Sequence, residues 1–109
     1  MLLREKNCSP QINVASLDKQ EAEALLSQLH QEWALDESHQ SIFFDFKFSN
    51  FHETMSFVNA LAWVAHQQDH HPDLEIAYKH CLVRYSTHSV GGLSENDFIC
   101  AARIEQLLF

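Results

Sequence analysis

The chain has few basic residues, no long apolar run, no closely paired cysteines and only two glycines, and each shortage excludes something. Seven lysines and arginines stand against fifteen aspartates and glutamates, which gives a formal net charge of −8 over 109 residues. Nucleic acids and anionic membranes are bound by clustered basic side chains. We therefore expect neither nucleic acid nor membrane as a partner.

Signals for export, membrane insertion and structural cross-linking are also missing. The longest uninterrupted apolar run, Ala60–Ala65, is far shorter than the roughly 20 residues of a membrane helix. Met1–Pro10 carries charges and lacks the apolar core of a signal peptide. The cysteines, Cys8, Cys81 and Cys100, are widely spaced, which indicates neither a disulfide framework nor a zinc knuckle. These features predict a cytoplasmic protein.

No repeat, low-complexity tract or linker divides the sequence, which predicts one domain over residues 17–109 behind a loose N-terminal arm over residues 1–16. Asp18 and Glu21 have the spacing of a capping box and predict a first helix that runs to about His30.

The next stretch has the pattern of a β-hairpin. Trp33–Asp36 is a short strand candidate, and a polar turn follows it. Ile42, Phe44, Phe46 and Phe48 then occupy alternate positions. A period of two is typical of a strand with one buried face.

A second helix should begin at Asn50, which has Glu53 three residues on, and should end near His70 or His71 because Pro72 disfavours helical geometry before it. Its apolar residues lie on more than one side of the helix. A helix this apolar in a small protein predicts contact with a second subunit, in a homodimer or a dimer of dimers. The expected stripe is Phe51, Met55, Val58, Leu61, Ala62 and Ala65, with Phe57 and Val64 beside it.

The remaining elements complete the predicted fold. Ile76–Thr87 forms one long strand or two strands joined by a bend, and Gly91 and Gly92 mark the turn after it. Ser94 and Asp97 have capping-box spacing and open a last amphipathic helix. The order is αββαββα or αββαβα. We expect an α+β fold in which three helices pack on one face of an antiparallel four-stranded sheet.

Histidine is the abundant residue, and six of the eight histidines lie between His52 and His88. His66 and His70 are four apart on one helical face, and His71 follows at the helix end. Imidazole titrates near pH 6.5, so two histidines in different surroundings can act as an acid and a base. A helix C-terminus favours protonated His70, which makes it a candidate acid. Surface or packing roles explain His30, His39, His52 and His80.

The spacing of several of these residues resembles the signature of the pterin-4a-carbinolamine dehydratases. The run Asp69 to Pro72, which includes both histidines, is followed by Tyr78, His88 and Asp97 at the family's spacings. The resemblance covers roughly residues 33–106. It implies dehydration of 4a-hydroxytetrahydropterin to quinonoid dihydropterin in tetrahydrobiopterin recycling, with a reduced pterin as substrate and no metal or organic cofactor.

The resemblance also implies roles for individual residues. His70 and His88 would transfer protons, and His71 would bind and orient the pterin. The residues that would line the substrate pocket beside these histidines are Asp69, Ser86, Thr87 and Ser89.

One position departs from the family pattern. The family has an acidic residue four positions before the first histidine, and here that residue is His66. A carboxylate would raise the pKa of His70, whereas a charged imidazole would lower it, so His66 is a modulator of the site.

Two alternatives to catalysis stay open. The chain could be a non-catalytic module that binds a pterin or serves as a dimerisation partner of a transcription factor, as some family members do. Alternatively, His66 and His70 have the i, i+4 spacing at which two imidazoles bind one metal ion, with His71 or His88 as a third ligand.

Overall fold

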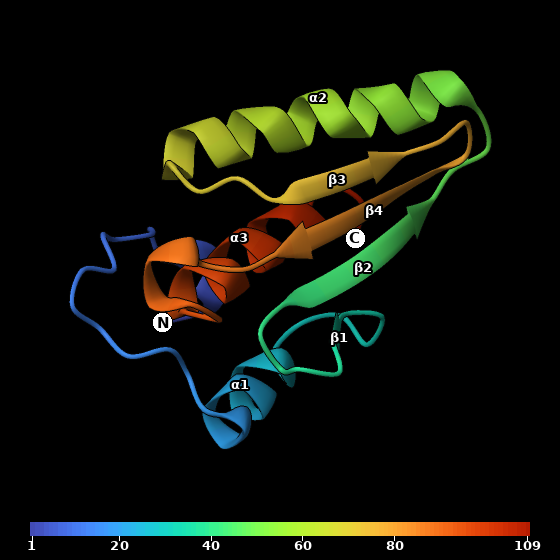
Figure 1. Cartoon of the computed structure of the whole chain (residues 1–109). Coiled ribbons are helices and arrows are strands. Elements are labelled where there is room, and N and C mark those ends of the chain that lie inside the picture. The colour runs from blue at the N-terminus through green and yellow to red at the C-terminus, as the bar shows by residue number, and fades with distance from the viewer.

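The structure is a computed structural model that describes all 109 residues (Figure 1). Its elements confirm the predicted α+β fold and, of the two predicted orders, αββαββα, with α3 behind the strands and α2 running alongside them. Along the chain they are a 3₁₀ turn at Leu3–Glu5, α1 (Lys19–Leu26), β1 (Ala34–Leu35), β2 (Ile42–Lys47), α2 (Phe51–Gln68), β3 (Asp73–Ile76), β4 (His80–Tyr85), a 3₁₀ turn at His88–Val90 and α3 (Glu95–Glu105).

The four strands form one antiparallel sheet in the order β1-β2-β4-β3. In the central pair, Phe44 lies opposite Val83, and both side chains are buried. Their neighbours along each strand are half-buried, which confirms the period of two predicted for β2. The buried face therefore carries the core, and the helices cover it.

The segment predicted as one strand or two is a hairpin. β3 begins at Asp73, before the expected Ile76, and the turn to β4 is closed by the Ala77 amide, which donates to the His80 carbonyl oxygen at 2.9 Å. β3 lies at the sheet edge and is mostly exposed, and the alternation of Leu74 and Ile76 with Asp73 and Glu75 is too short to reveal a strand.

The predicted helix starts are confirmed. The Asp18 and Glu21 side chains each accept from the other residue's amide, at 2.8 and 3.0 Å, and Asn50 Oδ1 accepts from the Glu53 amide at 2.9 Å. However, α1 stops at Leu26 rather than near His30. The His30 amide instead donates to the Glu105 carboxylate at 2.7 Å, which replaces a helical hydrogen bond.

The predicted apolar stripe of α2 is partly wrong. Phe51 is 45% exposed and Ala62 is exposed, because the face that packs on the core is the row Thr54, Phe57, Leu61 and Ala65. A helix that is apolar on several sides does not show by spacing alone which side is buried.

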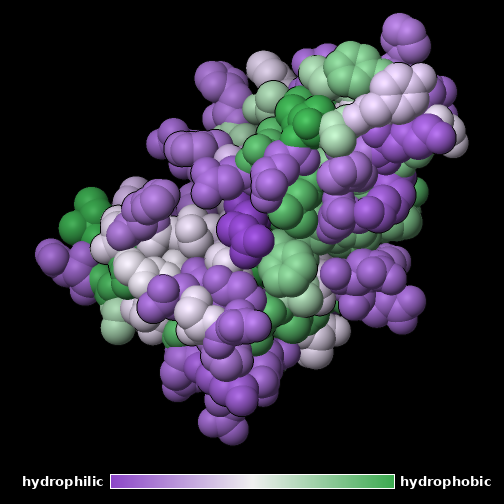
Figure 2. All heavy atoms as spheres, turned by 45° about the vertical axis from the view of Figure 1, so that its right-hand side comes forward, coloured by the Kyte–Doolittle hydropathy of each residue, from purple (hydrophilic) through white to green (hydrophobic).

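A second set of apolar side chains is thus left at the surface. Trp63, on α2, is 61% exposed. Figure 2 shows apolar atoms in contiguous groups among polar ones on the face turned forward there. No helix of the structure has the length and apolarity that crossing a membrane requires.

The N-terminal arm is packed against the domain, unlike the loose segment expected. Leu3 is buried, and the Arg103 Nε donates to the Lys6 carbonyl oxygen at 3.0 Å. The Cys8 amide donates to Gln68 Oε1 at 2.7 Å. The arm therefore lies over α3 and the end of α2, and side chains of those two helices hold its backbone.

Candidate active site

The candidate site lies where α2 ends, β4 ends and α3 begins. α2 ends at Gln68 because Asp69 takes a left-handed conformation, with φ of 52°. The chain then turns so that the His70 carbonyl accepts from the Tyr85 hydroxyl at 3.2 Å. The two rings stack with their centroids 5.3 Å apart. Contacts with β4 therefore fix both the backbone and the ring of His70.

Asp97 binds the other edge of that ring. The His70 Nε2–H donates to Asp97 Oδ1 at 2.6 Å, and the Asp97 side chain is wholly buried. Its Oδ2 accepts from the Thr87 hydroxyl at 2.8 Å and from the Ser94 amide at 3.0 Å. Both oxygens of the buried carboxylate thus have donors, as a buried charge requires. One residue caps α3 and also orients the imidazole of His70.

The pKa of His70 is raised above its ordinary value of 6.5. Burial acts to lower this pKa, but the Asp97 carboxylate outweighs burial as a hydrogen-bond acceptor and as a negative charge. The predicted preference for protonated His70 therefore agrees with the structure, although its cause is Asp97 rather than the helix end. Nδ1 of His70 has no partner in the protein, which leaves it for a ligand.

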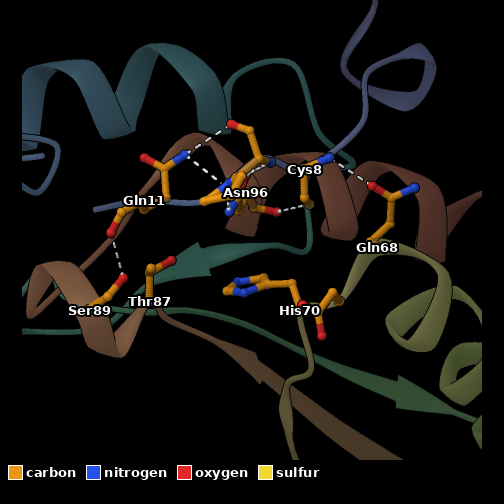
Figure 3. Close-up of a pocket in the computed structure, with 10 residues that line it drawn as sticks. Cys8, Gln11, Gln68, His70, Thr87, Ser89 and Asn96 are labelled. Atoms are coloured by element: carbon orange, nitrogen blue, oxygen red, sulfur yellow. Dashed lines mark hydrogen bonds between the residues drawn. The ribbon is translucent and has the colours of Figure 1, made fainter. Parts of the chain in front are cut away.

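A hollow of about 250 Å³ opens beside His70 (Figure 3). It has one apolar residue among the ten that line it, so it suits a polar ligand. In Figure 3 the His70 ring extends toward Thr87 beneath the arm. Ser89 Oγ donates to the Gln11 carbonyl oxygen at 2.9 Å and joins the two walls. The lining residues come from the arm (8–11), the end of α2 (68–70), the loop after β4 (87 and 89) and Asn96.

Two further hollows adjoin the first. One, of about 350 Å³, shares Asp69 and His70 with it and adds His66 and His71. The other, of about 320 Å³, shares Thr87 with the first and has no apolar residue in its lining. It contains the remaining predicted residues, which are Ser86 and His88.

The predicted site residues are therefore gathered at one end of the sheet but do not all open into one pocket. His70 lines two hollows, His71 lines one of them, and His88 lines the third. Thr87 is the residue between the two sides, because it lines the His70 hollow and the His88 hollow.

The position of His88 depends on the turn that follows it. His88 is exposed and begins the 3₁₀ turn, and Gly91 ends this turn with φ of 69°, a conformation that favours glycine. The Thr87 amide donates to the Gly92 carbonyl oxygen at 2.7 Å and closes the loop. A Cβ on Gly92 would lie 3.2 Å from the Ser16 Cβ of the arm. The left-handed conformation therefore favours glycine at position 91, and the close approach of the arm favours glycine at position 92.

The geometry contradicts the alternative of a metal site at His66 and His70. His70 lies beyond the end of α2, so His66 and His70 are not on one helical face. His66 is exposed, with its ring 5.6 Å from that of Trp63. The His70 Nε2 is occupied by Asp97, and no group of three or more His, Cys, Asp or Glu side chains is arranged to hold a metal ion.

The sequence pattern predicts a helix cap at Asp97 and no part for the arm in the site. The one sequence signal that could assign Asp97 to the site is its position in the dehydratase spacing. Cys8 and Gln11 have no such signal, because the arm is brought to the hollow by hydrogen bonds between its backbone and the side chains of Gln68 and Ser89.

Comparison of the sequence with known proteins shows its family. A family described as pterin 4 alpha carbinolamine dehydratase matches residues 15–107. A Nitrosomonas eutropha protein with a provisional name for that dehydratase is 53% identical over 107 residues, which are 97% of this chain and 93% of that one. A similarly named Legionella pneumophila protein is 46% identical over 107 residues, 97% of this chain and 95% of its own.

Solved structures show the same fold. A Brucella melitensis protein described as a transcriptional coactivator/pterin dehydratase superposes with a TM-score of 0.81 at 29% identity, over 86% of this chain and 99% of that one. A pterin dehydratase-like protein described as a RuBisCO assembly factor of the α-carboxysome gives 0.62 at 22% identity, over 72% and 90% of the two chains, and supports the fold alone. The chain belongs to the pterin-4a-carbinolamine dehydratase family.

Proposed function

We propose that the protein is a hydro-lyase that converts a 4a-hydroxytetrahydropterin into quinonoid dihydropterin in tetrahydrobiopterin recycling, and that it works in the cytoplasm. Besides family membership, the observation that supports this most is the His70–Asp97 pair at 2.6 Å on the edge of a polar hollow. An imidazole whose pKa is raised by a buried carboxylate is a proton donor at neutral pH.

The reaction needs two proton transfers and no electron acceptor. The bond from C4a to the hydroxyl oxygen breaks as the N5 lone pair forms the C4a–N5 double bond. One proton goes to the departing hydroxyl, which leaves as water, and one proton leaves N5. An acid and a base held on either side of the ring accelerate both steps.

We assign these steps by the surroundings of each histidine. Protonated His70 delivers the proton to the 4a-hydroxyl through its unpartnered Nδ1, while Asp97 holds Nε2. His88 takes the proton from N5. Thr87, which lines both hollows, lies between the two proton-transfer positions.

His71 binds and orients the pterin from the neighbouring hollow. The polar edge of the ring is bound by the pocket-lining residues Asp69, Ser86, Thr87 and Ser89.

The assay is the rate of quinonoid dihydropterin formation from enzymatically generated carbinolamine, with and without the protein. We expect acceleration over the spontaneous reaction, lost on His70→Gln and kept on His52→Gln, an exposed histidine of α2 that lines none of the three hollows. If the rate is unchanged and no dihydropterin binds, the enzymatic proposal is wrong.

Binding without turnover would favour the non-catalytic alternative instead. The exposed apolar side of α2 and the coactivator description of the Brucella relative support a partner role, with a homodimer as the simplest assembly. The variant His66→Glu restores the family's acidic residue two residues before the end of α2 at Gln68. If the departure at this position limits catalysis, this variant is faster than the natural protein.

A further inference from the structure

Two cysteines from distant parts of the chain meet behind the candidate site. Cys8 of the arm and Cys100 of α3 are 92 positions apart in sequence, and their sulfurs lie 3.5 Å apart in hydrogen-bond contact. Cys81, the third cysteine, is buried in β4 and has no such neighbour. Of the three free cysteines, Cys8 and Cys100 are therefore the two whose thiols contact each other.

The two sulfurs differ in their access to solvent. Cys8 is half-buried and lines the hollow beside His70, as Figure 3 shows, whereas Cys100 is fully buried. The Cys100 sulfur lies 3.8 Å from the His70 carbonyl oxygen. A small oxidant that enters the hollow therefore reaches Cys8 first, and Cys100 stands behind it.

Hydrogen bonds hold the backbone at Cys8 and Ser9, and the Cys8 thiol also donates to the Asn96 carbonyl oxygen at 3.6 Å. The Cys8 amide donates to Gln68, and the Ser9 amide donates to Asn96 Oδ1 at 3.1 Å. A disulfide bond is about 2.05 Å long and the two sulfurs lie 3.5 Å apart, so they must approach by about 1.5 Å for the bond to form.

We propose that Cys8 and Cys100 are a redox-modification site, in which hydrogen peroxide converts the two thiols into an intramolecular disulfide and a thiol reductant reverses it. The proposal does not depend on pterin turnover. The disulfide would tie the arm covalently to α3 and fix one wall of the hollow.

The chemistry balances with peroxide as the only oxidant. The Cys8 sulfur attacks one peroxide oxygen, the O–O bond breaks, and the thiol proton leaves with the other oxygen as water, so that Cys8 becomes a sulfenic acid. Cys100 then attacks the Cys8 sulfur, forms the S–S bond and releases a second water. The hydrogen bond from Cys8 and the charge of protonated His70 help to lower the pKa of Cys100 despite its burial. The same contact, together with burial, raises the pKa of Cys8, so Cys100 is the more readily ionised sulfur and is the attacking group in the second step.

The sequence makes the product easy to identify. Tryptic cleavage after Lys6, Lys19, Lys79, Arg84 and Arg103 leaves the three cysteines in three different peptides, 7–19, 80–84 and 85–103. The reduced protein is treated with peroxide, alkylated and digested without reductant, and the peptides are read by mass spectrometry. We expect 7–19 joined to 85–103, an intact mass lower by two hydrogen atoms, and full reversal by dithiothreitol.

Matched variants and a stability measurement complete the test. Cys81→Ala should leave the cross-link unchanged, whereas Cys8→Ser and Cys100→Ala should abolish it. Closing so long a loop should raise the unfolding midpoint of the oxidised protein by about 10–20 °C. A disulfide-linked dimer, a sulfinic acid at Cys8 with Cys100 still reduced, or free thiols throughout would each overturn the proposal, whatever the pterin assay gives.

Discussion

His70 Nε2 lies 2.6 Å from Asp97 Oδ1, although the two residues are 27 positions apart in the chain. The same carboxylate accepts from the Thr87 hydroxyl and from the Ser94 amide. The end of α2, the end of β4 and the start of α3 are thus joined through one buried side chain. Because Asp97 also contacts His70, a change in the packing of these three elements would change the pKa of His70.

The first prediction concerns the charge of Asp97. In Asp97→Asn the amide keeps the shape of the side chain but removes the negative charge. Burial still lowers the pKa of His70 and the main influence that raises it is gone, so this pKa should fall below that of the natural protein. Dehydration should slow by roughly tenfold to a hundredfold, since the acid is less often protonated. NMR titration of the histidine ring protons measures the pKa.

Asp45→Asn is the control for this variant. Asp45 bonds the His80 ring at 3.0 Å on the other face of the sheet, away from the three hollows. This change should leave the pKa of His70 and the rate as they are. Equal effects of the two variants would mean that overall charge, rather than the Asp97 contact, determines the protonation of His70.

The second prediction is a pH dependence of stability. The pKa of His70 is higher in the folded protein than in the unfolded chain, so the folded state binds the proton more tightly. The stabilisation from protonated His70 is complete below about pH 6.5 and is lost as the pH rises through the folded pKa. Urea unfolding of the natural protein and of His70→Gln should show the larger difference in unfolding free energy at about pH 6 than at about pH 9. A difference that is constant with pH would contradict the raised pKa.

Much of the fold could be predicted because its signals are local. Phe44 and Phe46 alternate with partly polar neighbours, and the caps at Asp18 and Asn50 act over three residues, so short windows of sequence contain the whole pattern. Of the site, the positions of His70 at a helix end and of Gly91 in a turn are also local.

What could not be predicted depends on contacts between distant segments. The partnership of Asp97 with His70, the packing of the arm and the buried row of α2 are decided by tertiary packing, which apolar spacing does not encode. β3 was placed too late because an exposed edge strand needs no buried face. The metal alternative was wrong since it assumed that the helix continues to His70, whereas the left-handed Asp69 ends it.

The third prediction compares two buried threonines, Thr87 beside His70 and Thr54 in α2, whose hydroxyls both form hydrogen bonds. Thr87→Val removes the hydroxyl that bonds both Asp97 and Ser94, and should lower the unfolding free energy by about 1–3 kcal/mol. Thr54→Val removes a hydroxyl that donates to backbone carbonyls near the start of α2, and should destabilise by a similar amount. Only Thr87→Val should change the pKa of His70 and the dehydration rate.

The fourth prediction concerns the turn that positions His88. Gly91 has φ of 69°, and a Cβ there would meet no atom within 4 Å, so the cost of a side chain is entirely one of backbone conformation. Gly91→Ala should destabilise the protein by about 1–2 kcal/mol, while Gly91→Asn should cost less because asparagine tolerates the left-handed region. If His88 is the base, the dehydration rate should fall in the same order, Ala below Asn, since the strained turn displaces His88. Thermal unfolding and the dehydration assay measured on both variants test this, and a normal rate in a destabilised Gly91→Ala protein would show that catalysis does not need the turn.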